Sequence, residues 1–247
     1  MDFPRPLLLG HRGAGGEAPE NTWPAFEAAR NAGMHGFEID TTLTSDGVPV
    51  VVHDLTLERL THDKKSISDM SFPDLCKVDV GSHFNPRFKG ERVPRLEDVL
   101  DNYQDMVLDV EIKGLNPFSE KLSEMVIKLL RERDLLDQTI ISSFNPVIIK
   151  QVQSLEPSLR TGFNYLSDSI LALRRAWFGV FSRTFSKHPQ PGQVTEKYIA
   201  RQHRKGVRVI PWGANCEDDI RRLLNIGVDG IISDFPSLLY KTACGPR

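Results

Sequence analysis

The sequence of 247 residues contains only three cysteines, Cys76, Cys216 and Cys244, and they lie far apart. An odd and widely spaced set of cysteines argues against the disulfide framework of a small secreted protein. The same spacing is unlike that of a zinc site built from cysteine. The scarcity of cysteine therefore indicates a reducing compartment, and we expect a cytoplasmic protein.

An excess of positive charge is also absent. The 31 Lys and Arg residues are balanced by 33 Asp and Glu residues, and the formal net charge is −2. Proteins that bind nucleic acids usually carry a basic balance or a basic stripe. We therefore expect no nucleic-acid partner, and any site for an anion must be built locally from a few residues.

Long apolar runs are missing as well. The N-terminal run Leu7–Leu9 is too short for the apolar part of a signal peptide. No stretch approaches the ~20 apolar residues that span a membrane. The sequence therefore predicts no integral membrane segment, and it contains no internal repeat or low-complexity linker.

Short apolar runs alternate with amphipathic stretches along the chain, which is the rhythm of βα units around a parallel sheet. A barrel of this kind takes about 250 residues as one domain. Two domains of about 120 residues each remain possible on length alone. We predict an α/β fold, a (β/α)8 TIM-type barrel that forms one domain over residues 1–247. The predicted strands are Leu7–Gly10, Gly36–Leu43, Val48–His53, Met106–Lys113, Thr139–Phe144, Arg160–Tyr165, Phe178–Ser182, Val207–Gly213 and Val228–Ser233.

These strands are one more than a barrel needs. Thr44–Gly47 separates two of them by a turn that is too short for the crossover between parallel neighbours. One strand of that pair is therefore antiparallel or outside the barrel, or else the strand Phe178–Ser182 is wrong. We predict a somewhat distorted barrel with a small insertion after the third strand, at about residues 55–105. Phe72–Val93, with its scattered Pro, Gly and Asn, looks like the centre of that excursion.

Three helices are indicated by their boundaries or their periodicity. Asn21 or Thr22 is expected to cap a helix that stops at Gly33. Ser119–Arg133 has apolar residues on one face of a 3.6-residue period. Glu217–Asn225 is followed by a glycine stop at Gly227.

Polar side chains stand at the ends of four predicted strands, where an α/β barrel forms its active site. The first strand ends in His11 and Arg12, followed by glycines that let a phosphate approach the backbone. The second carries Glu38 and Asp40, which are two residues apart and therefore face the same side.

The other two strand ends complete the set. An apolar strand ends in His53, and a further strand carries Glu111 and Lys113 on one face. Crowded carboxylates would repel one another, and a bound hard cation resolves that repulsion. Oxygen ligands favour Mg²⁺ or Ca²⁺ over zinc.

Each of these signals has an ordinary structural explanation. A lone histidine after an apolar strand is more often a capping or core residue, and Glu-x-Asp and Glu-x-Lys pairs commonly form ion pairs at strand edges. The remaining histidines, among them His188, are expected at the surface, and His35 is expected to be structural. Four such coincidences at strand ends of one barrel favour an active site.

In order along nearly the whole chain, the motifs resemble those of the glycerophosphodiester phosphodiesterase family. The N-terminal set is specific, and the likeness continues to the last predicted strand. The motifs are His11-Arg12-Gly13, Pro19-Glu20-Asn21-Thr22, Glu38-Ile39-Asp40, Asp46–Asp54, Val93–Leu100, Glu111-Ile112-Lys113, Ile141–Phe144 and Gly227–Asp234.

The resemblance implies a metal-dependent phosphodiesterase that hydrolyses a small glycerophosphodiester to glycerol phosphate and an alcohol. It implies His11 and His53 as the catalytic acid and base, in an order that the sequence leaves open. It also implies attack by a neighbouring hydroxyl of glycerol, which gives a cyclic phosphate that is then hydrolysed. The implied metal ligands for Mg²⁺ or Ca²⁺ are Glu38, Asp40 and Glu111, and the implied substrate contacts are Arg12, Lys113 and Trp212.

The chain departs from the family pattern in a few places. Leu55 stands where the family usually has proline, and Gly213-Ala214 follows Trp212 where the family has Thr-Val. Segment Leu166–Pro191 resembles the family least, although it would form part of the substrate rim. Two alternatives therefore stay open, a lysophospholipase D-type activity on lysolipids and a non-catalytic relative. Because all the implied catalytic residues are present, the second is the weaker.

Overall fold

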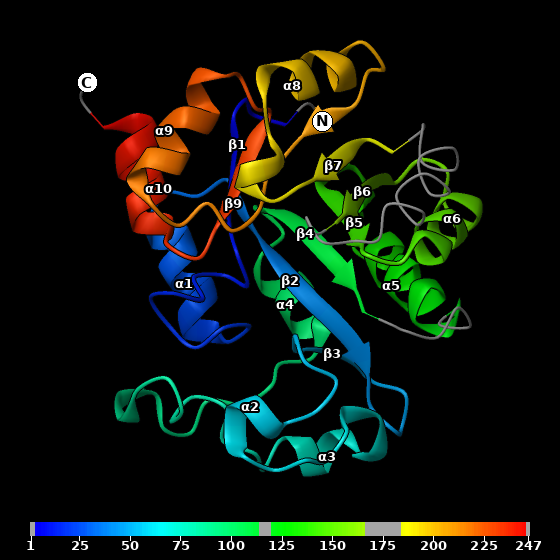
Figure 1. Cartoon of the computed structure of the whole chain (residues 1–247). Coiled ribbons are helices and arrows are strands. Elements are labelled where there is room, and N and C mark those ends of the chain that lie inside the picture. The colour runs from blue at the N-terminus through cyan, green and yellow to red at the C-terminus, as the bar shows by residue number, and fades with distance from the viewer. Residues whose placement is uncertain (1–2, 114–119, 166–183, 246–247) are drawn as a thin grey trace.

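The computed structural model describes residues 3–113, 120–165 and 184–245. Eight parallel strands form a barrel in the order β8-β7-β6-β5-β4-β2-β1-β9, with helices outside it (Figure 1). The predicted TIM-type barrel is thereby confirmed. Its strands are β1 (Leu7–Gly10), β2 (Gly36–Leu43), β4 (Val107–Ile112), β5 (Thr139–Ser143), β6 (Arg160–Asn164), β7 (Ser186–His188), β8 (Arg208–Val209) and β9 (Gly230–Ser233).

The predicted distortion is visible where the ring closes. The strand β8 has two residues, and it meets β9 through a few backbone hydrogen bonds and the isolated bridge of Trp212 with Ile232. The amide of Asp229 donates to the carbonyl of Val209 at 2.9 Å, for example. The barrel is therefore held at this seam by fewer bonds than between β2 and β4, where six residue pairs are in register.

The extra strand lies outside the ring. This was one of the alternatives predicted from the short turn Thr44–Gly47. The strand β3 (Pro49–Val51) pairs antiparallel with the end of β2, with Thr42 opposite Val50. Because β2 and β4 pair directly with each other, β3 adds no member to the barrel. The predicted strand Phe178–Ser182 lies outside the described residues.

The helices follow strands as the predicted βα rhythm requires. The three helices predicted from the sequence are all present, as α1, α5 and α9. The helices α1 and α5 begin and end close to the predicted residues, and α9 has the predicted limits. Thr22 is the N-cap of α1, and Gly33 and Gly227 adopt positive φ angles after α1 and α9. Apart from two short helices between β3 and α4, the helices in the described residues are α1 (Trp23–Asn31), α4 (Leu96–Asn102), α5 (Glu120–Glu132), α6 (Pro146–Leu155), α8 (Glu196–His203), α9 (Glu217–Asn225) and α10 (Pro236–Cys244).

Two layers of apolar side chains bury the strands. Alternation along β1 sends Leu8 outward to the core between strands and helices, and it sends Leu7 and Leu9 inward. The inward layer also contains Phe3 and Ile210, and it fills the amino-terminal half of the barrel. Polar side chains on the same inward faces therefore gather at the carboxyl-terminal end.

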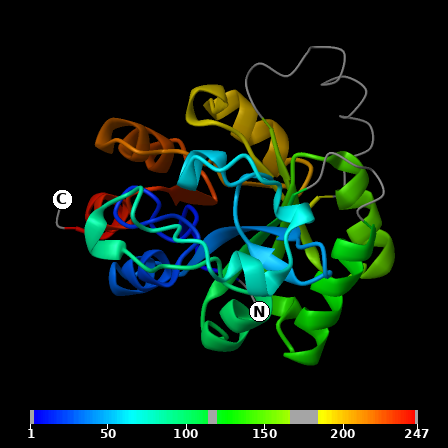
Figure 2. The same cartoon turned by 90° about the horizontal axis from the view of Figure 1, so that it is seen from below.

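The chain between β3 and α4 makes an excursion beyond the carboxyl ends of β2 and β4 (Figures 1 and 2). It contains the short helices α2 (Glu58–Thr61) and α3 (Phe72–Leu75) and the 3₁₀ turns Ile67–Asp69 and Pro86–Phe88. Its own core includes Leu57, Leu60 and Ile67. The helix α4 instead packs Leu96, Val99 and Leu100 into the main core of the barrel.

In the described part of the chain, none of the helices combines the length and the apolar character that crossing a membrane requires.

Candidate active site

A cavity of about 430 Å³ opens at the carboxyl-terminal end of the barrel. Seven of the eight predicted site residues line it, and Asp40 lies buried beside them. Both aromatic rings and charged groups line the cavity. Its lining consists of His11, Arg12, Glu38, His53, Glu111, Lys113, Phe144, Asn164, His188, Trp212 and Ile232.

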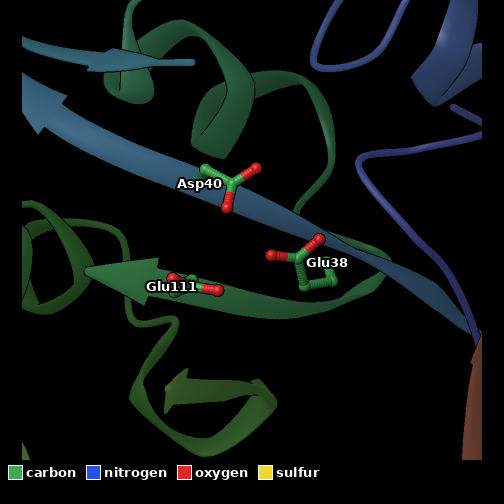
Figure 3. Close-up of side chains that lie close together, drawn as sticks. All are labelled: Glu38, Asp40 and Glu111. Atoms are coloured by element: carbon green, nitrogen blue, oxygen red, sulfur yellow. The ribbon is translucent and has the colours of Figure 1, made fainter. Parts of the chain in front are cut away.

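Three carboxylates meet at the centre of this end (Figure 3). Glu38 and Asp40 share the inward face of β2, and register places Asp40 opposite Glu111 on β4. One carboxylate oxygen from each lies within 4.8 Å of the others, and all three residues are buried. The spacing follows from parallel pairing of two strands whose polar residues alternate with Ile39 and Val110.

Cations balance part of this charge. The ammonium of Lys113 lies 2.9 Å from Asp40 Oδ1 and 2.6 Å from Glu111 Oε1, and Asn21 Nδ2 donates to Asp40 Oδ2 at 2.9 Å. Burial would raise the pKa of Asp40, but the charges of Lys113 and Arg12 outweigh it and hold that pKa below its ordinary range. Of the two residues expected to cap α1, Thr22 is the N-cap and Asn21 fixes this carboxylate.

Glu38 is less well compensated. Burial, and after it the charges of Asp40 and Glu111, raise its pKa well above the ordinary value. Its Oε1 atom is buried and has no hydrogen-bond partner within residues 3–113, 120–165 and 184–245. Two oxygens on opposite sides of a bound Mg²⁺ or Ca²⁺ are about 4–5 Å apart. The three carboxylates therefore fit one hard divalent cation, and the unpartnered oxygen of Glu38 marks where further positive charge is needed.

His11 is held by a carboxylate from the far end of the chain. Its Nδ1 lies 2.6 Å from Asp234 Oδ1, because β1 and β9 are neighbours and end together. The side-chain Nδ2 of Asn215 donates to the Asp234 carboxylate. The side-chain Oδ1 of Asn215 accepts from the backbone N–H of Asp234 at 2.9 Å. With Nδ1 bound in this way, Nε2 of His11 faces Glu38, 3.8 Å from its Oε2.

His53 has an analogous partner next to it in the sequence. Its Nδ1 lies 2.6 Å from Asp54 Oδ1. Burial lowers the pKa of His53, and the positive charges of Lys113 and Arg12 act in the same direction, against the opposing effect of Asp40. The imidazole is therefore mainly neutral at neutral pH, as a general base must be.

Arg12 occupies the turn after β1 in a left-handed conformation, with φ +51°. Its backbone amide donates to Glu38 Oε2 at 3.0 Å, and its guanidinium donates to Glu20 Oε1 at 3.0 Å. The next residue must be glycine, since a Cβ on Gly13 would lie 2.7 Å from the backbone carbon of Ala25. The turn thus brings a guanidinium to the rim of the carboxylate cluster.

Two aromatic rings form the apolar wall. Phe144 and Trp212 pack edge to face with ring centres 5.9 Å apart, and Trp212 lies 5.8 Å from the ring of His11. Both follow strands, the position from which the sequence predicted that Trp212 would reach the pocket. Much of the predicted rim segment Leu166–Pro191 lies outside the described residues.

The site also contains residues to which the sequence analysis gave no role. Asp54 and Asp234 stand in the quoted motifs, directly after His53 and Ser233, but nothing in a motif shows which ring each carboxylate contacts. Asn164 is the last residue of β6, for which Arg160–Tyr165 was predicted, and it donates to Glu111 Oε2 at 3.0 Å. A polar residue at a strand end was the available signal for it.

The predicted surface position of His188 is wrong. It was expected at the surface, yet it is 1% exposed, lies in β7 and lines the cavity. Its Nε2 is 2.9 Å from Ser186 Oγ, and its Nδ1 is 3.4 Å from Asp109 Oδ2. Burial lowers the pKa of His188 to about 3, so that the ring is neutral. The prediction failed because a three-residue strand of sequence Ser-Lys-His carries no apolar pattern.

The chain resembles known proteins over nearly its whole length. Residues 11–238 match the model of the glycerophosphoryl diester phosphodiesterase family. A glycerophosphodiester phosphodiesterase of Caldanaerobacter subterraneus subsp. tengcongensis is 33% identical over 239 residues, which cover 94% of this chain and 96% of that protein. A lysophospholipase D of Mus musculus is 26% identical over 94% of this chain and 84% of its own length.

A solved structure has the same fold. A phosphodiesterase of Oleispira antarctica, in complex with the product sn-glycerol-3-phosphate, superposes with a TM-score of 0.86 at 26% identity, covering 96% of each chain. The barrel, the site at its carboxyl-terminal end and the family match agree with one another. The chain belongs to the glycerophosphoryl diester phosphodiesterase family.

Proposed function

We propose that the chain hydrolyses glycerophosphodiesters with a divalent cation held by Glu38, Asp40 and Glu111 and with His53 and His11 as base and acid. Family membership makes the chain a glycerophosphodiester phosphodiesterase. The observation that carries the residue roles is the cluster of three buried carboxylates between two histidines, each with its own carboxylate partner. A small glycerophosphodiester is the expected partner, since the related Oleispira enzyme holds glycerol phosphate as its product.

The residues divide the reaction among them. Bound Mg²⁺ or Ca²⁺ would supply positive charge to the non-bridging oxygens of the phosphate. Arg12 and Lys113 share the remaining negative charge of the phosphoryl group. Trp212 and Phe144 cover the apolar side of the substrate.

The two imidazoles transfer the protons in this proposal. Neutral His53 takes the proton from the attacking oxygen, which belongs to water or to the neighbouring hydroxyl of glycerol, as that oxygen bonds to phosphorus. The bond from phosphorus to the leaving alcohol breaks, and His11 gives that alkoxide a proton through Nε2. When the glycerol hydroxyl has attacked, the product of this step is a cyclic phosphate. Water then bonds to its phosphorus with His11 as base, and the bond from phosphorus to that hydroxyl oxygen breaks with His53 as acid, which gives glycerol phosphate. Asp54 and Asp234 keep the two rings oriented, because each binds the Nδ1 atom that faces away from the reaction.

The preferred cation is either Mg²⁺ or Ca²⁺, since the ligands are all carboxylate oxygens. The expected cytoplasmic location stays a prediction, with which the three free cysteines agree.

The test is release of glycerol phosphate from glycerophosphocholine and glycerophosphoethanolamine, with Mg²⁺, Ca²⁺ or a chelator. We expect cation-dependent turnover that His11→Ala and His53→Ala each lower by about 10²-fold or more. His62→Ala, a change at an exposed histidine of the excursion, is the matched control. Turnover that survives the chelator, or both histidine variants, contradicts the proposal.

A second activity is favoured by one observation, the similarity to a mammalian lysophospholipase D. The same assay with lysophosphatidylcholine as substrate measures it, with lysophosphatidic acid as the product. Cation-dependent turnover of the lysolipid alone would assign the lysophospholipase activity, and no turnover of any of these diesters would favour a non-catalytic relative.

A further inference from the structure

Arg59 of α2 joins two carboxylates that come from different parts of the chain. Its Nε donates to Asp54 Oδ2 at 2.6 Å, and its two terminal nitrogens donate to Glu20 Oε2 at 2.9 Å and Glu20 Oε1 at 2.7 Å. Three bonds from one planar guanidinium fix both carboxylates in direction as well as in distance. An ammonium group could not reproduce that geometry.

Each of these carboxylates has a second partner in the active site. The other oxygen of Asp54 contacts His53 Nδ1 at 2.6 Å. Glu20 Oε1 also accepts from Arg12 at 3.0 Å. A continuous chain of charged hydrogen bonds therefore runs from His53 through Arg59 to Arg12.

We propose that Arg59 is a positioning residue for the hydrolysis, one that sets the orientation of His53 and of Arg12 together. This inference rests on the proposed function, in which His53 moves a proton and Arg12 contacts the phosphate. Arg59 itself does not line the cavity. It acts through Asp54 and Glu20.

The charges of the two carboxylates agree with this role. Burial would raise the pKa of Glu20, but the hydrogen bond from Arg59 and the charge of Arg12 outweigh it and lower that pKa. Burial would likewise raise the pKa of Asp54, and hydrogen bonds from His53 and Arg59 lower it instead. Both groups are therefore ionised at neutral pH, Glu20 between two guanidinium groups and Asp54 between the Arg59 guanidinium and the His53 imidazole.

The place of Arg59 in the fold makes the excursion part of the active site. The helix α2 is a single turn whose Leu60 is buried in the core of the excursion, next to Leu57. The guanidinium thus reaches the barrel from a separately packed segment. Its side chain is 45% exposed, and ion pairs of such exposure contribute little to stability. A large effect of Arg59 on the rate with a small effect on folding is therefore the distinguishing expectation.

The experiment compares Arg59→Gln and Arg59→Lys with Arg95→Gln as the matched control. Arg95 is 40% exposed and forms a similar fork to Asp98, with bonds of 2.9 and 2.8 Å, but away from the cavity. We expect Arg59→Gln to lower kcat by about 10- to 100-fold, as is found for outer-shell partners of site residues. Arg59→Lys should fall between wild type and Arg59→Gln, and the Tm should shift by no more than in Arg95→Gln.

A cycle of variants separates positioning from a merely structural role. In a Glu20→Gln, Asp54→Asn background, Arg59→Gln should change kcat by less than about twofold, because the groups through which it acts are already gone. An equal loss in both backgrounds overturns the inference. Kcat within twofold of wild type in both Arg59 variants overturns it as well.

Failure of the inference is distinguishable from failure of the proposed function. If His53→Ala abolishes turnover while Arg59→Gln leaves it unchanged, only the inference on Arg59 fails. If wild type turns over none of the diesters, or if His53→Ala retains its rate, the proposed function fails first and the inference with it. Should Arg59→Gln lower the Tm much more than Arg95→Gln, the comparison rests on Arg59→Lys, for which reduced kcat with normal Tm supports the inference and normal kcat overturns it.

Discussion

At the residue scale, the two site histidines have the same kind of partner, although the partners come from different parts of the chain. Each has Nδ1 at 2.6 Å from an aspartate, which leaves Nε2 for the substrate. For His53 that aspartate is the next residue, whereas for His11 it is Asp234, 223 positions away. The long-range pair depends on the pairing of β1 with β9, the first and last strands of the chain.

Asp234→Asn should reduce turnover with little change in stability. An amide at this position carries no charge to hold the imidazole of His11 in its orientation and tautomer. We expect kcat to fall by at least about 10-fold, and by no more than the 10²- to 10⁴-fold that general acid–base catalysis contributes. Steady-state kinetics on glycerophosphocholine provide the measurement, and Asp101→Asn, which disturbs a surface pair with Arg133, serves as the control.

His188 should make stability depend on pH with a predictable sign. Its pKa is about 3 in the folded state and about 6.5 when unfolded. Between these values the unfolded chain binds the extra proton, so that the free energy of unfolding falls as the pH drops, by up to about 1.4 kcal/mol per pH unit. This contribution is complete above pH ~6.5 and is lost toward pH 3.

Urea denaturation of wild type and His188→Gln between pH 5 and 8 measures this dependence. The variant should show a smaller loss of stability between pH 6.5 and 5. Asp109, whose pKa burial raises to about 8, contributes a slope of opposite sign, but it is present in both proteins. Identical pH dependence in the two proteins would rule out the buried neutral imidazole.

At the scale of elements, the site is a consequence of strand register. The roles expected for Glu38, Asp40 and Glu111 required only that two strands present polar residues on one face, and this much is readable from alternation in the sequence. Which strands are neighbours is not readable in the same way, since the barrel neighbour of β2 is β4, whereas β3 pairs antiparallel with the end of β2 outside the ring. The three-residue strand β7 also escaped prediction, because its residues are selected by tertiary burial and have no apolar pattern.

Gly162 illustrates such a tertiary requirement. It lies on β6 opposite Ser186 of β7, and a Cβ there would approach the ring of His188 to 2.5 Å. That ring is buried and has polar neighbours on both sides, so it has no free direction in which to move.

Gly162→Ala should therefore destabilise the protein by about 1–3 kcal/mol, the cost of overpacking a dense interior. Gly192→Ala is the control, because a Cβ at that position would have nothing within 4 Å and its effect should stay within about 0.5 kcal/mol. Chemical denaturation measures the free energy of unfolding of both variants, and equal values would contradict the tight packing at Gly162.

At the scale of the whole molecule, folding assembles negative charge that the barrel cannot fully neutralise. Glu38, Asp40 and Glu111 are buried together, and Lys113 contacts only two of them. We therefore expect the global stability of the protein to depend on a cation bound at this cluster. That coupling is measurable without any substrate.

Mg²⁺ or Ca²⁺ should stabilise the folded chain. At a concentration 100 times the Kd, binding to the folded state alone raises the free energy of unfolding by about 2.7 kcal/mol. Glu38→Gln should remove most of this rise, because it deletes one ligand and part of the repulsion. The measurement is thermal unfolding of wild type and Glu38→Gln with MgCl₂ or CaCl₂, compared with NaCl of equal ionic strength. An equal rise in Tm in both proteins would mean that the cation binds elsewhere.

The excursion after β3 departs from the barrel and returns to it at nearly the same point. Val50 forms a bridge with Arg95, and the amide of Val51 donates to the carbonyl of Pro94 at 2.9 Å. A segment with adjacent ends is suited to exchange by recombination, since a replacement of different length leaves the eight parallel strands undisturbed. Such grafts offer a route to new substrate ranges within this architecture. A graft that replaces residues 55–93 and lacks a counterpart of Arg59 would keep Asp54 but leave it and Glu20 without their shared partner.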